Sequence, residues 1–292
     1  ATRVKNTSDF ALAGRSLPLP MVITATFATW FGSETILGLP GRFIESGIAG
    51  VIEEPFGSGM ALILVGTFFA HKLYKQNILT LGDYYRDRYG RSVELLCSVA
   101  IVISYLGWVG AQVTALGLVI NLITEGAVSM TTGMVIGAAV VLAYTMVGGM
   151  WSVAMTDFVQ MIVIVVGLVA ILWFATDLAG GMDKVVDYAR GRDLFHAFPE
   201  PTTTGWLFWI SAAMTMMIGS IPQQDVFQRV MSAKNLPTAV AGPILGGSFY
   251  ILFAFVPMFI VVAAILVMPD AAEKMLSEDP QQLLPTLVRD YM

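Results

Sequence analysis

Seven long apolar runs constrain the fold of this 292-residue chain more than any other feature of its sequence. A membrane-spanning helix needs about 20 predominantly apolar residues. Windowed hydropathy places runs of this kind at residues 17–44, 47–70, 93–123, 130–150, 152–176, 205–227 and 239–268. Hydrophobic residues make up 56% of the chain and charged residues 13%, whereas about a quarter of a soluble domain is charged. The sequence therefore predicts an all-α polytopic membrane protein.

The loops between these runs predict how the chain is oriented. We expect residues 1–16 to form a cytoplasmic lead-in, residues 17–268 a transmembrane domain, and residues 269–292 an extracytoplasmic segment. With a cytoplasmic N-terminus, ten Lys and Arg residues, Arg3 among them, lie on the inner side and six on the outer side. Because Lys and Arg are enriched in cytoplasmic loops, this count favours a cytoplasmic N-terminus. We expect the membrane to be a bacterial inner (plasma) membrane.

Several classes of function find no support in the residue types. The single cysteine, Cys97, lies within an apolar run, which excludes a disulfide framework. His71 and His196 are far apart and do not suggest a metal site. The sequence pI of about 5.0 does not point to a nucleic-acid partner. Because no paired nucleophile and histidine and no Gly-rich phosphate loop stand out, we expect neither an enzyme nor an organic cofactor.

Two of the apolar runs are interrupted by residues that a plain membrane helix would not need. The stretch "ATWFGSETILGLPG", residues 28–41, places glycines, a proline and Glu34 inside the first run. The sixth run is interrupted by Gly219, Ser220 and Pro222, which Gln223 follows. Unwound backbone at membrane depth is tolerated where it lines a cavity, and broken helices of transporters bind ions and substrates there. The two runs are five apart, which is the spacing that a five-helix inverted repeat predicts.

Five carboxylates lie within or at the edges of the apolar runs, where a charge is costly unless it is paired or faces a cavity. Glu34 is the deepest in its run and lies beside the glycines. Glu53 and Glu54 could face a cavity or lie near the outer interface. Asp157 could be functional or could stabilise a helix N-terminus, and Asp225 could simply end the sixth run. The residues alone leave these alternatives open.

Four motifs resemble the sodium:solute symporter family. They are "DFALAGRSLP" at residues 9–18, "ILTLGDYYRDRYG" at 78–90, "AYTMVGGMWSVAMTDFVQ" at 143–160 and "IPQQDVFQRVMSAKN" at 221–235. The resemblance covers nearly the whole chain. It implies the first seven core helices of a leucine-transporter-like five-plus-five inverted repeat, in which the first and sixth helices are broken. It also implies alternating access coupled to sodium.

The resemblance assigns a sodium site to the first break. The positions that align with the family's cation ligands are Ala28 and Phe31, through their backbone carbonyls, and Asp157 is implied to assist. The family's remaining ligands are a hydroxyl pair on the eighth core helix, which would follow Met292. Judged against the family, we expect the chain to be truncated at both ends.

Within the family, the motifs are most similar to the choline-transporter branch. Trp30 and Trp108 align with aromatic residues that surround a quaternary ammonium, whereas Gln223 replaces a third tryptophan of that branch. The positions that contact sugar in other relatives are Met216 and Gly219, so a sugar is disfavoured. Ordinary packing remains an alternative for both tryptophans. The expected substrate-binding residues are Trp30, Glu34, Glu53, Glu54, Trp108, Met216, Gly219 and Gln223.

These observations favour a sodium-coupled symporter that imports a small organic solute across the lipid bilayer. A quaternary amine, a proline-like zwitterion and a monocarboxylate all remain open as the solute. Two other functions also remain: a transporter-like sensory membrane domain of a histidine kinase, and a structural membrane subunit that does not transport. The sequence does not decide the coupling ion, its stoichiometry or the oligomeric state.

Overall fold

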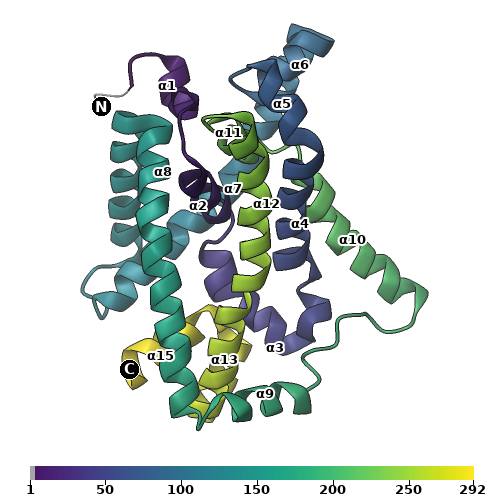
Figure 1. Cartoon of the computed structure of the whole chain (residues 1–292). Helices are drawn as coiled ribbons and strands as arrows, with labels where there is room; N and C mark the ends of the chain where they lie inside the picture. The colour runs from purple at the N-terminus through teal and green to yellow at the C-terminus, as the bar shows by residue number, and fades with distance from the viewer. Residues whose placement is uncertain (1–3) are drawn as a thin grey trace. The chain divides into compact units, whose positions relative to one another are not determined.

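The computed structural model describes residues 4–292, so Arg3 and the rest of the first three residues of the expected lead-in lie outside the described part. Residues 4–292 form helices joined by turns and contain no β-strand; their one extended pairing is a parallel bridge between Leu17 and Ala233 (Figure 1). The prediction of an all-α fold is confirmed.

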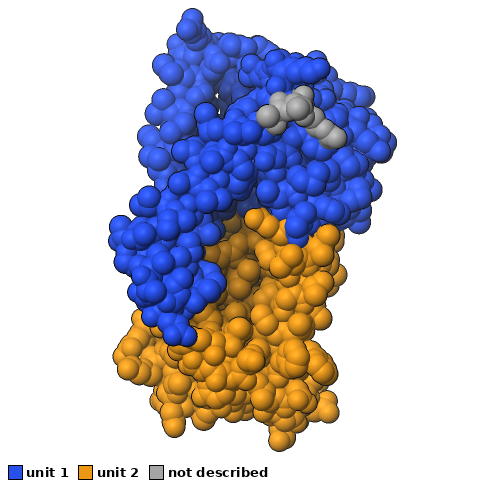
Figure 2. Space-filling model, turned by 90° about the vertical axis from the view of Figure 1, so that its left-hand side faces the viewer, with its two compact units in different colours: residues 1–29, 62–159, 221–246 blue, residues 30–61, 160–220, 247–292 orange. Residues whose placement is uncertain are grey.

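The chain divides into two compact units, which Figure 2 colours separately. Unit 1 comprises residues 1–29, 62–159 and 221–246, and unit 2 comprises residues 30–61, 160–220 and 247–292. Two of the positions at which the chain passes between units, 29/30 and 220/221, fall at the predicted interruptions of the first and sixth runs.

Unit 1 is built around the lead-in and the motifs at residues 78–90 and 221–235. Its small core consists of Leu12, Leu81, Phe227 and Met231, which bring together three segments far apart in the sequence. Its elements, some of which continue into unit 2, are α1 (Thr7–Leu12), η1 (Ala13–Arg15), α2 (Leu19–Ala28), α4 (Ser58–Leu64), η4 (Val65–Phe69), α5 (Ala70–Gln76), α6 (Leu81–Tyr89), α7 (Arg91–Ile123), α8 (Met130–Leu178), α11 (Gln224–Met231) and α12 (Leu236–Phe253).

Unit 2 is organised around α13, an apolar helix in which eight of the 13 residues are buried. This helix packs against α3, α9, α14 and α15. Besides its parts of α4, α8 and α12, the elements of unit 2 are η2 (Glu34–Gly38), α3 (Leu39–Gly50), η3 (Ile52–Gly57), α9 (Met182–Gly191), α10 (Thr203–Gly219), α13 (Phe255–Val267), α14 (Pro269–Glu278), η5 (Pro280–Gln282) and α15 (Leu283–Tyr291).

Helices long and apolar enough to cross a membrane are present in the described part of the chain. There are four, or five if a bent pair is counted as one span. The four are Ile52–Gln76, Arg91–Ile123, Met130–Leu178 and Leu236–Val267, and the bent pair is Thr203–Gly219 with Gln224–Met231. The boundaries of the seven expected spans and the cytoplasmic placement of the N-terminus stay predictions.

Both predicted helix breaks are confirmed. The first span is divided where α2 ends at Ala28 and helical structure resumes near Glu34. The second is divided between α10 and α11, whose axes differ by 44°. Pro222 explains the second break. It cannot donate a backbone hydrogen bond, and the residue before a proline is disfavoured in a helix.

Helix α8 is too long to be a single membrane span. Its 49 residues would extend about 74 Å, at about 1.5 Å per residue, more than twice the roughly 30 Å of a bilayer core. Gly149 interrupts it with φ 52° and ψ −146°, a conformation that residues with a Cβ rarely adopt. A Cβ at this position would also lie 2.5 Å from the carbonyl oxygen of Phe10. Gly149 therefore turns the chain and lets the lead-in approach closely.

Candidate functional site

The first break exposes backbone groups that a continuous helix would use internally. Ala28 is the last residue of α2, so its carbonyl is among those that have no partner within the helix. The carbonyl of Trp30 accepts hydrogen bonds from the amide of Gly32 (2.8 Å) and from Thr35 Oγ1 (3.1 Å). The oxygen of Trp30 is therefore occupied by donors of the protein. The ligands predicted for a cation are the neighbouring carbonyls of Ala28 and Phe31.

A buried polar cluster lies just after this break, entirely within unit 2. It consists of Thr35, Glu54 and Tyr250, from the first, second and seventh spans. Thr35 Oγ1 lies 2.6 Å from Glu54 Oε1 and 3.0 Å from Tyr250 Oη. The hydroxyl of Tyr250 also donates to Glu54 Oε1. Because Thr35 and Tyr250 are fully buried and Glu54 is 9% exposed, the cluster holds a carboxylate away from bulk water.

The local backbone of the second span directs two adjacent carboxylates to different environments. Glu54 has an extended conformation (φ −138°, ψ 124°) that interrupts the helical turn of η3. Its neighbour Glu53 has a side chain that is 38% exposed. Among residues 4–292, Glu54 forms no ion pair, so its carboxylate is stabilised by hydroxyl groups alone.

The other two carboxylates of this region share one arginine. Arg42 lies 2.5 Å from Glu34 Oε1 and 3.9 Å from Glu53 Oε2. All three side chains are between 38% and 53% exposed, so solvent screens these pairs. The structure therefore places Glu34 against Arg42 and away from the buried cluster's hydrogen bonds.

Aromatic side chains border the buried cluster. The ring of Phe31 packs edge-on against Tyr250, with centroids 6.0 Å apart, and 5.4 Å from Phe253. Trp30 is 9% exposed. This surrounding is apolar and supplies π faces, the kind of surface that attracts an organic cation.

Helix α10 brings Met216 to the same part of unit 2. A Cβ on Gly57 would lie 3.3 Å from Met216 Cβ and 3.0 Å from the Ala213 carbonyl oxygen. This close approach, three residues after Glu54, leaves little room for a larger residue at position 57. Gly219, the last residue of α10, has open space around the position of a Cβ. Met216 and Glu54 thus lie on elements in contact, while Gly219 lines the break.

In unit 1, Asp157 is the buried carboxylate of α8. Its Oδ2 is buried and has no hydrogen-bond partner within the described residues, and Arg229 on α11 is the charge that attracts it. Buried polar atoms are almost always hydrogen-bonded, so such an oxygen calls for a ligand or a function. Asp157 lies two turns after the kink at Gly149, so the dipole of a helix N-terminus does not explain it.

Tyr105 connects α7 to the start of α11 in unit 1. Its hydroxyl accepts a hydrogen bond of 3.1 Å from the amide of Asp225, and its ring packs edge-on against Trp108. Gln223 immediately precedes α11. Through its contact with Tyr105, Trp108 lies near the second break. Its side chain is 45% exposed, so it has no buried packing role.

Sequence reasoning named Glu54 but missed its two partners. Thr35 and Tyr250 are ordinary residues of apolar runs, and only folding brings positions 35, 54 and 250 together. It also missed Arg42 as the partner of Glu34. Within residues 4–292, no group of three His, Cys, Asp or Glu side chains could hold a metal ion. The assignments of individual residues to cation or solute stay predictions.

Comparison with known proteins identifies the family. The profile of the sodium:solute symporter family matches residues 10–292. The chain belongs to the sodium:solute symporter family. The resemblance seen in the four motifs is thus confirmed, and the proteins of this symporter family that the chain resembles are transporters rather than enzymes.

Similar members of the symporter family include choline and glucose transporters. The chain is 29% identical over 258 residues to the high-affinity choline transporter 1 of Caenorhabditis elegans, covering 87% of this chain and 43% of that protein. It is 30% identical to the Homo sapiens high affinity choline transporter 1, and the match covers 77% of this chain and 38% of that protein. It is 28% identical to sodium/glucose cotransporter 4 of Danio rerio, and the match covers 87% of this chain and 41% of that protein. The chain therefore spans about two fifths of the length of these relatives.

A solved structure shares the fold of this symporter-family chain. It is a substrate-bound outward-open state of a Na⁺-coupled sialic acid symporter, with a TM-score of 0.82 and 17% sequence identity. The match covers 100% of this chain and 62% of that one. It confirms the predicted leucine-transporter-like architecture of a polytopic membrane protein.

Proposed function

We propose that the full-length protein is a symporter that couples sodium entry to the import of a small organic solute by alternating access. The observation that carries this proposal is the pair of breaks in two helices five apart, found in a member of the sodium:solute symporter family. Broken helices of this kind place backbone carbonyls and helix ends where ions and solutes bind in transporters.

Sodium, the co-transported ion, is proposed to bind at the first break. Carbonyl oxygens are suitable ligands for such a hard cation, and the candidates are those of Ala28 and Phe31. Asp157 supports the proposal independently, because its buried Oδ2 has no hydrogen-bond partner within the described residues. A nearby sodium ion would offset the cost of burying that negative charge.

The solute is proposed to bind beside the buried cluster of unit 2, with Glu54, Trp30 and Met216 as its contacts. Glu54 is a carboxylate held by hydroxyl groups and without an ion pair among residues 4–292. A solute with a cationic group would gain charge attraction there, whereas a monocarboxylate would be repelled. A quaternary amine or a zwitterion is therefore favoured. Roles for Glu34, Glu53, Trp108, Gly219 and Gln223 remain predictions.

The breaks also supply a physical means of alternating access. A few residues outside regular helix, such as 29–32 in the first break, can absorb changes in φ and ψ while the helices on either side stay rigid. Sodium shifts the equilibrium between the two access states of the transporter only by the difference between its affinities for those states. A carbonyl site formed in one state and not in the other would provide that difference.

The test is uptake into proteoliposomes that contain the full-length protein. Radiolabelled choline, glycine betaine, proline and lactate are supplied outside, with either sodium or potassium as the external cation. We expect one of the first three to accumulate only with inward-directed sodium. Accumulation equal in sodium and potassium, or of lactate alone, would contradict the proposal.

A further inference from the structure

The buried cluster of unit 2 contains more hydrogen-bonding contacts than an ionised Glu54 could fill. Thr35 Oγ1 lies 2.6 Å from Glu54 Oε1 and 3.0 Å from Tyr250 Oη. It also lies 3.1 Å from the carbonyl oxygen of Trp30, and Tyr250 Oη bonds to Glu54 Oε1. These four contacts need four hydrogens, whereas the hydroxyl groups of Thr35 and Tyr250 supply one each. An ionised carboxylate supplies none, so two of the four contacts would lack a hydrogen.

A proton on the Glu54 carboxyl group supplies a third hydrogen. The positions of oxygen atoms do not fix where such hydrogens lie, so the hydrogens are assigned from the network as a whole. With a proton on Oε1, Glu54 donates to Thr35, and the Thr35 hydroxyl is free to donate to the Trp30 carbonyl. Tyr250 still donates to Glu54 Oε1. The donors then follow one direction from Tyr250 on α12 to the backbone of the first break, which links the charge of Glu54 to that break.

No nearby cation offsets a negative charge on Glu54. The residue is 9% exposed, and it forms no ion pair with any side chain of residues 4–292. The other charged residues of η2, α3 and η3 are Glu34, Arg42, Glu45 and Glu53, whereas α10 and α12 have none. Arg42 is already shared by Glu34 and Glu53, and all three side chains reach solvent. Because an unpaired buried charge is costly, a carboxyl group in this position is stabilised by keeping its proton.

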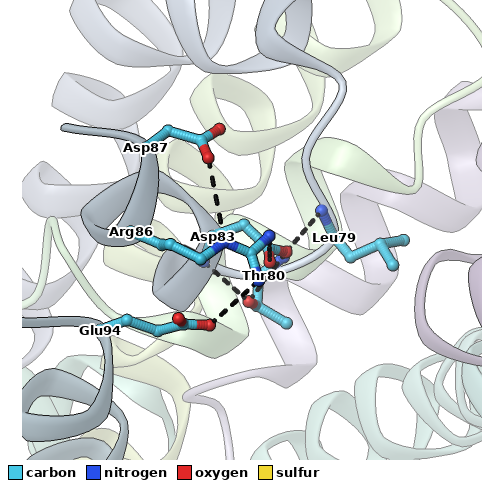
Figure 3. A network of polar contacts seen from close by, with 6 residues as sticks. All are labelled: Leu79, Thr80, Asp83, Arg86, Asp87 and Glu94. Atoms are coloured by element: carbon cyan, nitrogen blue, oxygen red, sulfur yellow. Dashed lines mark hydrogen bonds and ion pairs between the residues drawn. The ribbon is translucent and has the colours of Figure 1, made fainter. Parts of the chain in front are cut away.

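The polar network between α6 and α7 in unit 1 shows the opposite arrangement (Figure 3). Arg86 lies 3.1 Å from Asp83, 3.4 Å from Glu94 and 3.9 Å from Asp87. A guanidinium supplies both hydrogens and positive charge, which favours the ionised form of a carboxyl group. Glu94 therefore has the same carboxyl group as Glu54, with a cation in place of the two hydroxyl groups, and serves as the comparison for it.

We propose that Glu54 binds a proton in the solute-free protein and releases it to water when the cationic group of a solute enters the buried cluster. The O–H bond of Glu54 breaks, the proton leaves for bulk water, and the positive charge of the solute takes its place. Proton and solute therefore compete, and each lowers the affinity for the other by the same factor. The exchange step rests on the proposed function of this site, whereas the proton on the solute-free protein does not.

The first test is the infrared spectrum of the purified full-length protein at neutral pH without solute. A protonated carboxyl group has a C=O stretching band that an ionised carboxylate lacks. We expect Glu54→Gln to remove one such band, Glu54→Asp to shift it, and Glu94→Gln to leave it unchanged. Glutamine resembles the protonated acid in shape and charge, so Glu54→Gln should fold with a Tm close to that of the wild type. A band that Glu54→Gln leaves intact, or that Glu94→Gln removes equally, would overturn the proposal.

The second test measures proton release on solute binding in a weakly buffered solution. The probe is whichever of choline, glycine betaine and proline accumulates in the uptake experiment. Binding should release about one proton per solute from the wild type and none from Glu54→Gln, and the Kd for the wild type should rise up to about tenfold per unit of acidification. Binding to the wild type without proton release would overturn the exchange. If none of the three solutes binds, the proposed function and the exchange both fail, while the infrared band still decides whether Glu54 holds a proton.

Discussion

The hydroxyl of Thr35 lies 2.6 Å from the carboxylate of Glu54, which joins the residues just after the first helix break to the second span. The hydroxyl of Tyr250 joins the same carboxylate to the seventh span. Three spans thus meet at one buried acidic group. A solute drawn to that group would contact all three, which makes the cluster the point at which solute binding could influence the break.

Tyr250→Phe should weaken solute binding. The change keeps the ring against Phe31 and removes the donor to Glu54, and a hydrogen bond to a charged group contributes about 1.5–3 kcal/mol. We expect the KM for the transported solute to rise roughly ten- to hundredfold, with the sodium dependence little changed. Tyr188→Phe, on α9 and facing Arg192, is the matched control and should behave as wild type. An unchanged KM in Tyr250→Phe would rule out the role of this hydroxyl.

Asp157→Asn should lower the apparent affinity for sodium. The substitution keeps the shape of the side chain and removes the charge whose Oδ2 is buried without a hydrogen bond. Loss of a charge attraction of about 1.4 kcal/mol corresponds to a tenfold higher half-saturating sodium concentration. Uptake measured against sodium concentration tests this, with normal expression and with Asp177→Asn, exposed on the same helix, as the control. Sodium dependence identical to wild type would reject a role in cation binding.

Trp30→Leu should distinguish an aromatic contact from ordinary packing. Leucine remains apolar in this nearly buried site but has no π face. A cation over an aromatic face contributes about 0.5–2 kcal/mol, so choline or betaine affinity should fall roughly two- to thirtyfold. Trp173→Leu, exposed on α8, serves as control. A lower Tm with unchanged affinity would instead favour the packing explanation.

Arg42→Gln should affect function more than stability. Its pairs with Glu34 and Glu53 are partly exposed, and such pairs contribute only about 0–1 kcal/mol. Thermal unfolding should therefore change little. Because Arg42 competes for Glu34, its removal should increase the affinity for a cationic solute if Glu34 supplies a counter-charge. A weaker affinity for that solute would show that Arg42 holds the site in its working shape.

Gly149→Ala should destabilise the protein. The position has φ 52°, and a Cβ there would meet the Phe10 carbonyl at 2.5 Å. This combination of φ and ψ, which glycine alone adopts readily, costs about 1–3 kcal/mol for a residue with a Cβ, and the close contact adds to it. Gly167→Ala on the same helix has open space and should be neutral or stabilising. Equal melting temperatures for the two variants would contradict this account of the turn.

The helix breaks could be predicted from sequence because glycine, proline and carboxylates inside an apolar run have few structural explanations in a membrane. The family could be predicted because its motifs are local stretches in a fixed order. Both types of information are contained in short segments, so no tertiary contact was needed to read them.

The buried cluster could not be predicted, because burial of Tyr250 and Thr35 depends on how three distant spans pack. Glu53 and Glu54 are adjacent and chemically alike, and only the extended backbone at Glu54 separates a buried carboxylate from a half-exposed one. Hydropathy likewise could not foresee that Arg42 would pair with Glu34. Side-chain partners across the fold are decided by packing, not by spacing.

Sodium coupling is tested most directly by the solute accumulation ratio in proteoliposomes held at zero membrane potential, as the external sodium concentration is varied. A symporter predicts that the ratio of internal to external solute rises with the sodium gradient and that an outward gradient expels preloaded solute. A ratio that stays at one for every gradient, with normal solute equilibration, would contradict the account.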